Sequence, residues 1–157
     1  MSWFETIADL DAGTETLRRR RYGVIETEAG ALRAVHLRPW PKLLSLREVL
    51  PLGDRYHATG EGDRCWLYYN QPRGHSKFLA LKYVVTTPDA KYATFRAALK
   101  ALDRVAEIKR SDALLCDAAN RRLSDRFLQR MGWEAHAPQW GRRNFIRRFY
   151  GDYPVHG

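Results

Sequence analysis

Two arginine-rich segments are the parts of this chain whose residue types point most directly to chemistry. Residues 18–21 are four consecutive arginines before a tyrosine, and residues 142–150 interleave arginine with phenylalanine and tyrosine. Guanidinium groups neutralise phosphates and aromatic rings stack on bases, so the segments predict an RNA or DNA interface. The arginines concerned are Arg18, Arg19, Arg20, Arg21, Arg142, Arg143, Arg147 and Arg148. The alternative is that Phe145 and Phe149 belong to the core of a closing strand and the arginines only cover its edge.

The composition agrees with an anionic partner. The formal net charge is +9, which favours nucleic acid, an acidic protein surface or a phosphorylated cofactor. With 45% hydrophobic and 29% charged residues, the 157-residue chain is expected to form one soluble domain spanning 1–157. No apolar run approaches the roughly 18 residues that span a bilayer, so we expect no membrane partner. The sequence does not indicate an oligomeric state.

The cysteines and histidines do not form a recognisable reactive group. No two histidines have the i, i+4 spacing of a zinc protease and no CxxC pair occurs, so we expect no metal. Cys65 and Cys116 each lie in an apolar run, where cysteine behaves as a small hydrophobic residue. Together with the absence of a secretory signal, this usage favours the cytoplasm.

Hydrophobic periodicity predicts an alternation of strands and helices. Residues 88–109 have apolar side chains at helical spacing, and they separate two strand-like runs at 77–87 and 112–118. A helical crossover makes such a strand pair parallel. Other expected strands are 22–27, 31–37, 54–59, 64–70, 133–138 and 143–150, and other expected helices are 2–12, 42–50 and 121–131. The predicted fold is therefore α/β (α+β): one twisted mixed sheet of six to eight strands, antiparallel in its first part, with helices on both faces.

The C-terminal order carries a family resemblance. The C-terminal part of the chain resembles the second half of the GNAT superfamily, the acyl-CoA-dependent N-acyltransferases. The resemblance lies in the order of a buried strand, Asn120, an amphipathic helix, the pair Gly132-Trp133 and two further strands. The resemblance is best over 54–150, after an N-terminal helix and arginine-rich extension at 1–21. It implies a GNAT-like fold that binds acetyl-CoA or another acyl-CoA between the strands at 77–87 and 112–118. The implied activity is direct transfer of the acyl group to an amine.

The resemblance also assigns coenzyme-binding positions. The positions that match the family's coenzyme-binding residues are Val84, Val85, Thr86, Lys91, Thr94, Arg96 and Asn120. The family's pyrophosphate motif is Arg/Gln-x-x-Gly-x-Gly/Ala, and this chain has lysine, threonine and arginine at its three fixed positions. Glycine normally lets a phosphate approach the unpaired amides at the start of a helix. Asn120 has an alternative interpretation as the N-cap of the following helix.

The expected catalytic residues are missing. The family's tyrosine, four residues before Gly132, is replaced by Leu128, with Phe127 beside it. Neither has a transferable proton, and Ser124 is the nearest hydroxyl and only a weak candidate. Two hypotheses remain: an N-acyltransferase, or a catalytically silent GNAT-fold module that binds RNA, DNA or an acidic partner through its arginine-rich face.

Overall fold

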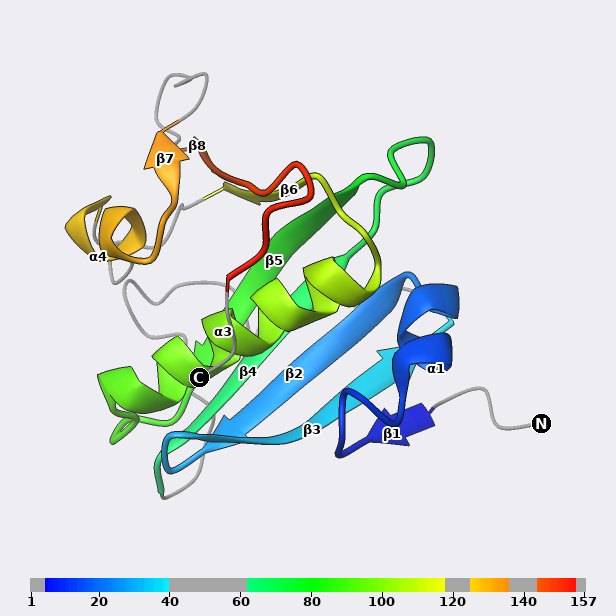
Figure 1. Cartoon of the computed structure of the whole chain (residues 1–157). Helices are drawn as coiled ribbons and strands as arrows, with labels where there is room; N and C mark the ends of the chain where they lie inside the picture. Colours follow the sequence, from blue (N-terminus) through cyan, green and yellow to red (C-terminus); the bar gives the residue numbers. More distant parts are fainter. Residues whose placement is uncertain (1–4, 40–61, 118–124, 136–143, 155–157) are drawn as a thin grey trace.

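The structure is a computed structural model that describes residues 5–39, 62–117, 125–135 and 144–154, and it is organised around one mixed sheet of eight strands (Figure 1). The strands are β1 (Glu5–Ile7), β2 (Tyr22–Glu28), β3 (Ala31–Arg38), β4 (Arg64–Asn70), β5 (Phe78–Thr86), β6 (Ala113–Asp117), β7 (Glu134–Ala135) and β8 (Asn144–Arg148). The described helices are α1 (Thr14–Arg19), α3 (Tyr92–Ile108) and α4 (Asp125–Arg130). The strand order is β1-β3-β2-β4-β5-β6-β8-β7. The predicted α+β class with a single mixed sheet is confirmed.

The direction of the strands divides the sheet into two parts. Strands β1 to β5 pair antiparallel, whereas β5 and β6 pair parallel and are joined by the α3 crossover. After β6 come α4, Gly132-Trp133, β7 and β8, which is the order that carried the GNAT resemblance. Gly132 has φ 91°, and the Trp133 N–H donates to the Leu128 carbonyl at 2.9 Å, so Gly132 ends α4 as predicted.

The core lies between α3 and the sheet. Leu99, Leu102 and Val105 are buried on one side of α3, and Ile25 and Leu67 meet them from β2 and β4. A polar contact also fixes the helix, because the buried Thr27 hydroxyl donates to the Thr94 carbonyl at 2.8 Å. Apolar residues recur every 3.6 positions in α3 and every second position in β4, and these two patterns predict the buried face of each element.

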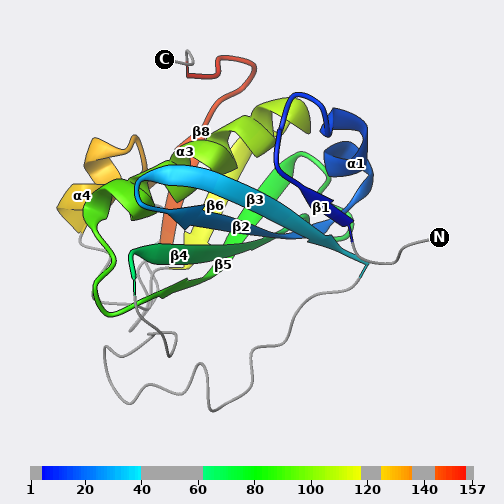
Figure 2. The same cartoon turned by 90° about the horizontal axis from the view of Figure 1, so that it is seen from below.

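The described helices lie on one side of the sheet. In Figure 2, α1 and α3 lie on the same face, with α4 beside the amino end of α3. The predicted helix at 42–50 and the predicted strand at 54–59 fall outside the described residues. Helices on both faces therefore stay a prediction.

The N-terminus departs from the prediction. In place of a helix over 2–12, residues 5–7 form β1, which pairs with Val35–Leu37 of β3, and the helix begins only after Gly13. The free edge of β3 offers backbone partners to this segment, and local residue spacing does not reveal such a long-range partner. Residues 5–19 therefore contain the strand β1 and the helix α1, and not one helix followed by an extension.

None of the helices in the described residues is both long and apolar enough to cross a membrane.

Candidate functional site

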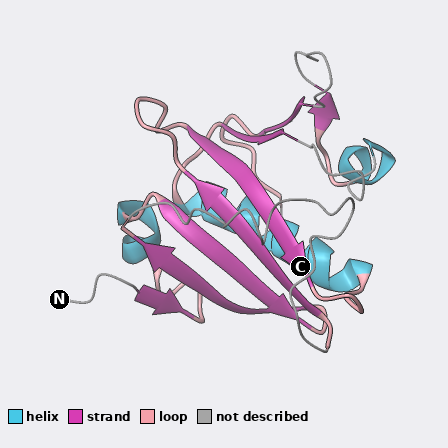
Figure 3. Ribbon diagram, turned by 180° about the vertical axis from the view of Figure 1, so that it is seen from behind, coloured by secondary structure: helices cyan, strands magenta, loops and turns pink. Residues whose placement is uncertain are grey.

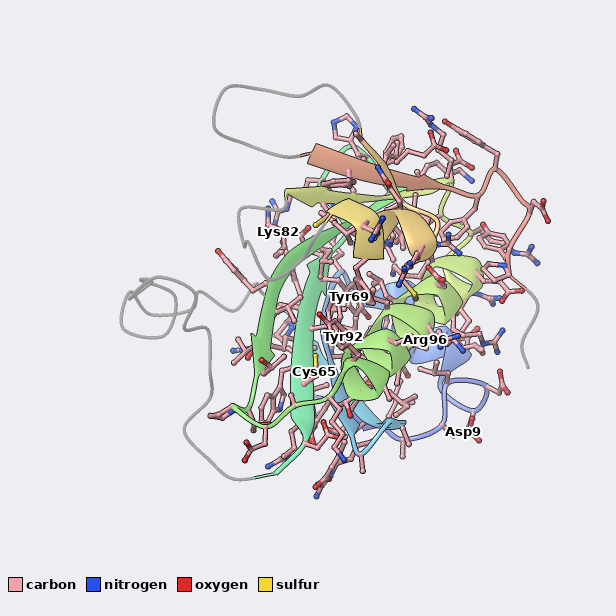
Figure 4. All side chains as sticks on the ribbon, turned by 90° about the vertical axis from the view of Figure 1, so that its left-hand side faces the viewer. Asp9, Cys65, Tyr69, Lys82, Tyr92 and Arg96 are labelled. Atoms are coloured by element: carbon pink, nitrogen blue, oxygen red, sulfur yellow. The ribbon has the colours of Figure 1, made fainter. Side chains whose placement is uncertain are left out.

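The first feature of the candidate site is the point where β5 and β6 separate. Their parallel pairing covers only Phe78–Leu81 on β5 and ends at the pair Leu81–Cys116, although β5 continues to Thr86. One residue further along, the register of β5 against β4 shifts, so that Lys82 is the extra residue of a β-bulge. The exposed Lys82 lies on β5 in Figure 4. Beyond the bulge, β5 is paired with β4 on one side and no longer with β6 among the described residues.

The second feature is the amino end of α3, which follows the far end of β5. Lys91 is the N-cap residue in extended conformation, and no acidic residue lies in the first turn of α3. The Lys91 N–H donates to the Asp63 carboxylate at 2.7 Å. A carboxylate is favoured at this position because the aligned peptide dipoles leave the helix start positive. Within the described part of the chain, the N–H groups of Tyr92 and Ala93 have no partner.

The third feature is a basic surface on α3 and α4. Its exposed side chains are Lys91, Arg96, Lys100, Arg126 and Arg130. None of these five forms an ion pair or side-chain hydrogen bond with another described residue, unlike the arginines of α1 and β8. An aromatic pair crosses between the helices, where the Tyr92 ring, 75% exposed as a residue, lies 5.7 Å from the Phe127 ring. Figure 4 shows Tyr92 and Arg96 on α3.

The predicted coenzyme residues are partly brought together. Val84, Val85 and Thr86 lie on β5 beyond the bulge, and Lys91 and Arg96 lie at the amino end of α3. Thr94 faces inward, since it is fully buried and its hydroxyl accepts the Gly30 N–H at 2.8 Å. Its side chain is therefore occupied by the β2–β3 turn. Asn120 and Ser124 lie outside the described residues.

The first arginine segment is largely used inside the fold. Arg19 and Arg20 each contact the Glu5 carboxylate at 2.9 Å. Arg18 Nε donates to the Ile108 carbonyl at 3.0 Å, and Arg21 reaches the Pro72 carbonyl at 3.5 Å. These contacts tie α1 to β1, α3 and the β4–β5 loop.

The second arginine segment is similar. Arg147 pairs with Asp103 of α3 at 2.9 Å, Arg148 pairs with Glu134 at 2.9 Å, and Phe145 and Phe149 are buried. Arg142 and Arg143 lie outside the described residues. The described contacts match the alternative in which the aromatic residues are core, and nucleic-acid binding by these arginines stays a prediction.

Side chains able to exchange protons are few at the strand separation. Leu128 is fully buried, and Phe127 stacks against Phe95 with ring centroids 5.3 Å apart. Tyr68 and Tyr83 face each other across β4 and β5 directly after the bulge, with ring centroids 6.3 Å apart. Cys65 is buried, and burial raises the pKa of its thiol to about 12, so it is not a nucleophile.

No three His, Cys, Asp or Glu side chains group as ligands in the described ranges.

Three of these features were not predicted from the sequence. The bulge at Lys82 corresponds to no pattern of residue types. The Asp63 carboxylate accepts a hydrogen bond from the N–H of Lys91, which is 28 residues away in the sequence. The Tyr92–Phe127 pair joins two helices separated by β6. Only the exposed i, i+4 series Tyr92, Arg96, Lys100 could have been read from the helical spacing.

Comparison with known proteins adds little to this description. No family model and no curated protein matches the chain. A solved structure of nourseothricin acetyltransferase aligns over 94% of this chain and 99% of that chain, with 13% identity and a TM-score of 0.42. This similarity is weak, so the account of the fold rests on the strand order of the chain itself.

Proposed function

We propose that this chain is an acyl-CoA-binding protein of GNAT type that transfers an acyl group to an amine by direct transfer. The observation that carries the proposal is that, among the described residues, β5–β6 pairing ends at Leu81–Cys116 and is followed at once by the bulge at Lys82. A strand that is paired on only one side offers backbone groups to a second extended chain. The pantetheine arm of coenzyme A is such a chain, because it is narrow and carries two amide groups.

The length of β5 beyond the bulge suits this role. Lys82 to Val85 is a four-residue stretch that spans about 13 Å at the usual rise of a strand. The stretch leads from the strand separation toward the amino end of α3, which begins at Tyr92. A thioester at the bulge and a pyrophosphate at the helix would therefore lie at opposite ends of one extended site.

The charges at the helix support the phosphate end of this site. Helix amides without partners bind phosphate oxygens, and the amides of Tyr92 and Ala93 meet that description within the described residues. Lys91 and Arg96 can add charge-assisted contacts in place of the missing glycines. The exposed Tyr92 ring offers a stacking surface for the adenine.

The proposed chemistry relies on position more than on acid–base groups. Holding the amine against the thioester converts the transfer into an effectively unimolecular step. A backbone N–H at the bulge polarises the thioester carbonyl and stabilises the oxyanion that develops. Tyr83, the next residue after the bulge, is the nearest phenol in register that could protonate the departing thiolate.

The experiment that tests coenzyme binding is a thermal denaturation series with acetyl-CoA. At a hundred times its dissociation constant the coenzyme is expected to stabilise the protein by about 2.7 kcal/mol. Lys91→Glu and Arg96→Glu each reverse a charge on an exposed side chain, so the melting temperature without ligand is expected to hold while the shift is lost. Dephospho-CoA should give a smaller shift, because it lacks one phosphate.

Arg73→Glu is the matched control. Arg73 is exposed in the β4–β5 loop, at the opposite end of β5 from α3, and forms no side-chain hydrogen bond or ion pair with another described residue. Its reversal changes the net charge equally and should leave the acetyl-CoA shift intact. Equal losses in all three variants would mean that only the overall charge matters, and the proposed site would be wrong.

Asp63→Asn is expected to move stability and affinity in opposite directions. The carboxylate stabilises the start of α3 through the Lys91 N–H, and removing its charge should cost up to about 1 kcal/mol. The same charge opposes a pyrophosphate at that helix end, so acetyl-CoA should bind Asp63→Asn several-fold more tightly. Titration calorimetry checks this, with the exposed Asp152→Asn as control. Weaker binding to Asp63→Asn would place the phosphates elsewhere.

The binding-module alternative is tested in the same series by adding a short RNA. No described contact favours this alternative, since Arg147 and Arg148 are already ion-paired. Salt-sensitive stabilisation by RNA without any response to acetyl-CoA would replace the transferase proposal with the alternative.

A further inference from the structure

We propose that Thr6, His36 and Glu26 form a second reactive site, in which the Thr6 hydroxyl accepts an acyl group from an activated ester or thioester. The three residues lie on neighbouring strands β1, β3 and β2. Thr6 Oγ1 is 3.1 Å from His36 Nδ1, and His36 Nε2 is 3.1 Å from Glu26 Oε1. A hydroxyl, an imidazole and a carboxylate in this sequence of contacts are the parts of an activated nucleophile.

The site is on the face of the sheet opposite α3. Ile25 and Thr27 of β2 point to α3, so the alternating residues Val24 and Glu26 point to the other face. His36 pairs with Val24 and with Thr6 in the register of the sheet, which puts all three side chains on that face. Figure 3 shows this side, where β1, β3 and β2 lie next to one another.

Glu26 is held as an ionised carboxylate. Its side chain is 10% exposed, and its second oxygen, Oε2, contacts Arg64 at 3.1 Å and Arg33 at 3.3 Å. Burial alone would raise the pKa of Glu26, but the hydrogen bonds from His36 and Arg64 together with their charges lower it below its ordinary value. Arg33 is itself held in place by a second ion pair, with Glu28. The Glu26 carboxylate is therefore fixed from several sides and remains unprotonated near neutral pH.

The contacts determine which nitrogen of His36 carries the proton. An ionised carboxylate only accepts hydrogen bonds, so Nε2 must donate to Glu26. In the neutral ring, Nδ1 then has a lone pair and can only accept, so the hydrogen bond with Thr6 is donated by the hydroxyl. The Thr6 O–H is therefore directed at a base, and Glu26 positions that base and stabilises the imidazolium formed when it takes the proton.

The nucleophile is open to solvent, whereas the carboxylate is not. Thr6 is exposed and the His36 side chain is 39% exposed, so an acyl donor can reach the hydroxyl. The reaction is an acyl exchange: the Thr6 oxygen bonds to the donor carbonyl carbon as its proton passes to His36 Nδ1. The bond to the thiolate or phenolate then breaks, and that leaving group takes the proton. No oxidant or metal is needed.

The test uses p-nitrophenyl acetate, a donor that does not depend on the coenzyme site. Fragment-ion mass spectrometry of the N-terminal peptide is expected to show acetyl on Thr6. His36→Gln should slow acetylation of Thr6 on the order of 100-fold, the usual contribution of a positioned general base. Glu26→Gln keeps an oxygen that can accept from His36 Nε2 but removes the negative charge, so it should also slow acetylation of Thr6, because the imidazolium formed in the reaction loses its carboxylate partner.

The controls separate reactivity from folding and from random acylation. Thr16→Val and His75→Gln change the same residue types at α1 and in the exposed β4–β5 loop, and both should leave Thr6 acetylation unchanged. Thr6→Val changes an exposed side chain and should abolish the adduct without altering the melting temperature. Absence of acetyl on Thr6 in the unmodified chain, or equal rates with His36→Gln, would overturn the proposal whatever the response to acetyl-CoA.

Discussion

Replacing Arg147 by methionine is expected to destabilise the fold by about 3 kcal/mol, because the change leaves a buried carboxylate without its partner. Arg147 Nε lies 2.9 Å from Asp103 Oδ1, and the two side chains are only 17% and 12% exposed. Burial raises the pKa of Asp103 even though Arg147 opposes the increase. The guanidinium also fills the space beside Gly132, where a Cβ atom would collide with Arg147 Nη1. Chemical denaturation measures the loss.

The neighbouring Arg148 supplies the control for this prediction. Its partner Glu134 is 61% exposed, so Arg148→Met should cost less than about 1 kcal/mol. Adding Asp103→Leu to Arg147→Met removes the orphaned charge and should recover most of the loss. The Arg147→Met penalty should shrink as pH falls, because without Arg147 burial raises the pKa of Asp103 further, and the folded variant then takes up a proton at a pH where the natural chain does not. Equal penalties for Arg147→Met and Arg148→Met would refute the structural role of the pair.

The second large effect is expected at Lys109, which joins α1 to α3. Its ammonium group donates to the carbonyls of Leu17, Arg18 and Arg20 at 2.8, 3.1 and 2.8 Å. Arg18 Nε returns the contact by donating to the Ile108 carbonyl. Each helix thus supplies a cation to the carbonyl end of the other, where the helix dipole is negative. Lys109→Met leaves three carbonyls without this donor and should cost about 2 to 3 kcal/mol.

The pH dependence gives Lys109 a second signature. Burial, with a smaller contribution from the charge of Arg21, lowers the pKa of Lys109 to about 8, against 10.5 as its ordinary value. Between these two values the unfolded chain binds more protons, so this group makes stability rise with pH across that window. Denaturation at several pH values should show the stability of the natural chain rising relative to that of Lys109→Met across this window, because other titrating groups such as Cys65 contribute equally to both chains. Lys100→Met, at an exposed position of the same helix, should change stability by less than about 0.5 kcal/mol.

Local patterns predicted the parts of the fold whose residues carry their own periodicity. The strand at 64–70 and the long helix were placed from alternation and 3.6-residue spacing, and Gly132 marked a helix end that only a positive φ satisfies. The spacing of Ile7 and Leu10 predicts a helix at the N-terminus, whereas pairing with the edge of β3 determines the strand β1. Local spacing does not reveal a long-range partner of this kind.

The candidate site was less predictable for the same reason. Lys91 and Arg96 could be located by counting from the strand before the helix, but Thr94 proved to face the β2–β3 turn, because that turn reaches the start of α3. The bulge at Lys82 and the carboxylate of Asp63 depend on register and on contacts across 28 residues. The contacts among Thr6, His36 and Glu26 likewise depend on the strand order β1-β3-β2, which residue types alone do not specify.

Hydrogen exchange with and without saturating acetyl-CoA tests the proposed coenzyme site most directly. The proposal predicts slower exchange in peptides that cover 82–85 of β5 and the first turn of α3, because the coenzyme shields these amides and accepts hydrogen bonds from those that do not face β4. The strand β1, which lies at the far edge in the sheet order, should exchange at an unchanged rate. Unchanged exchange at 82–85 at saturating coenzyme, or protection confined to β1, would contradict the proposal that acyl-CoA binds where β5 leaves β6.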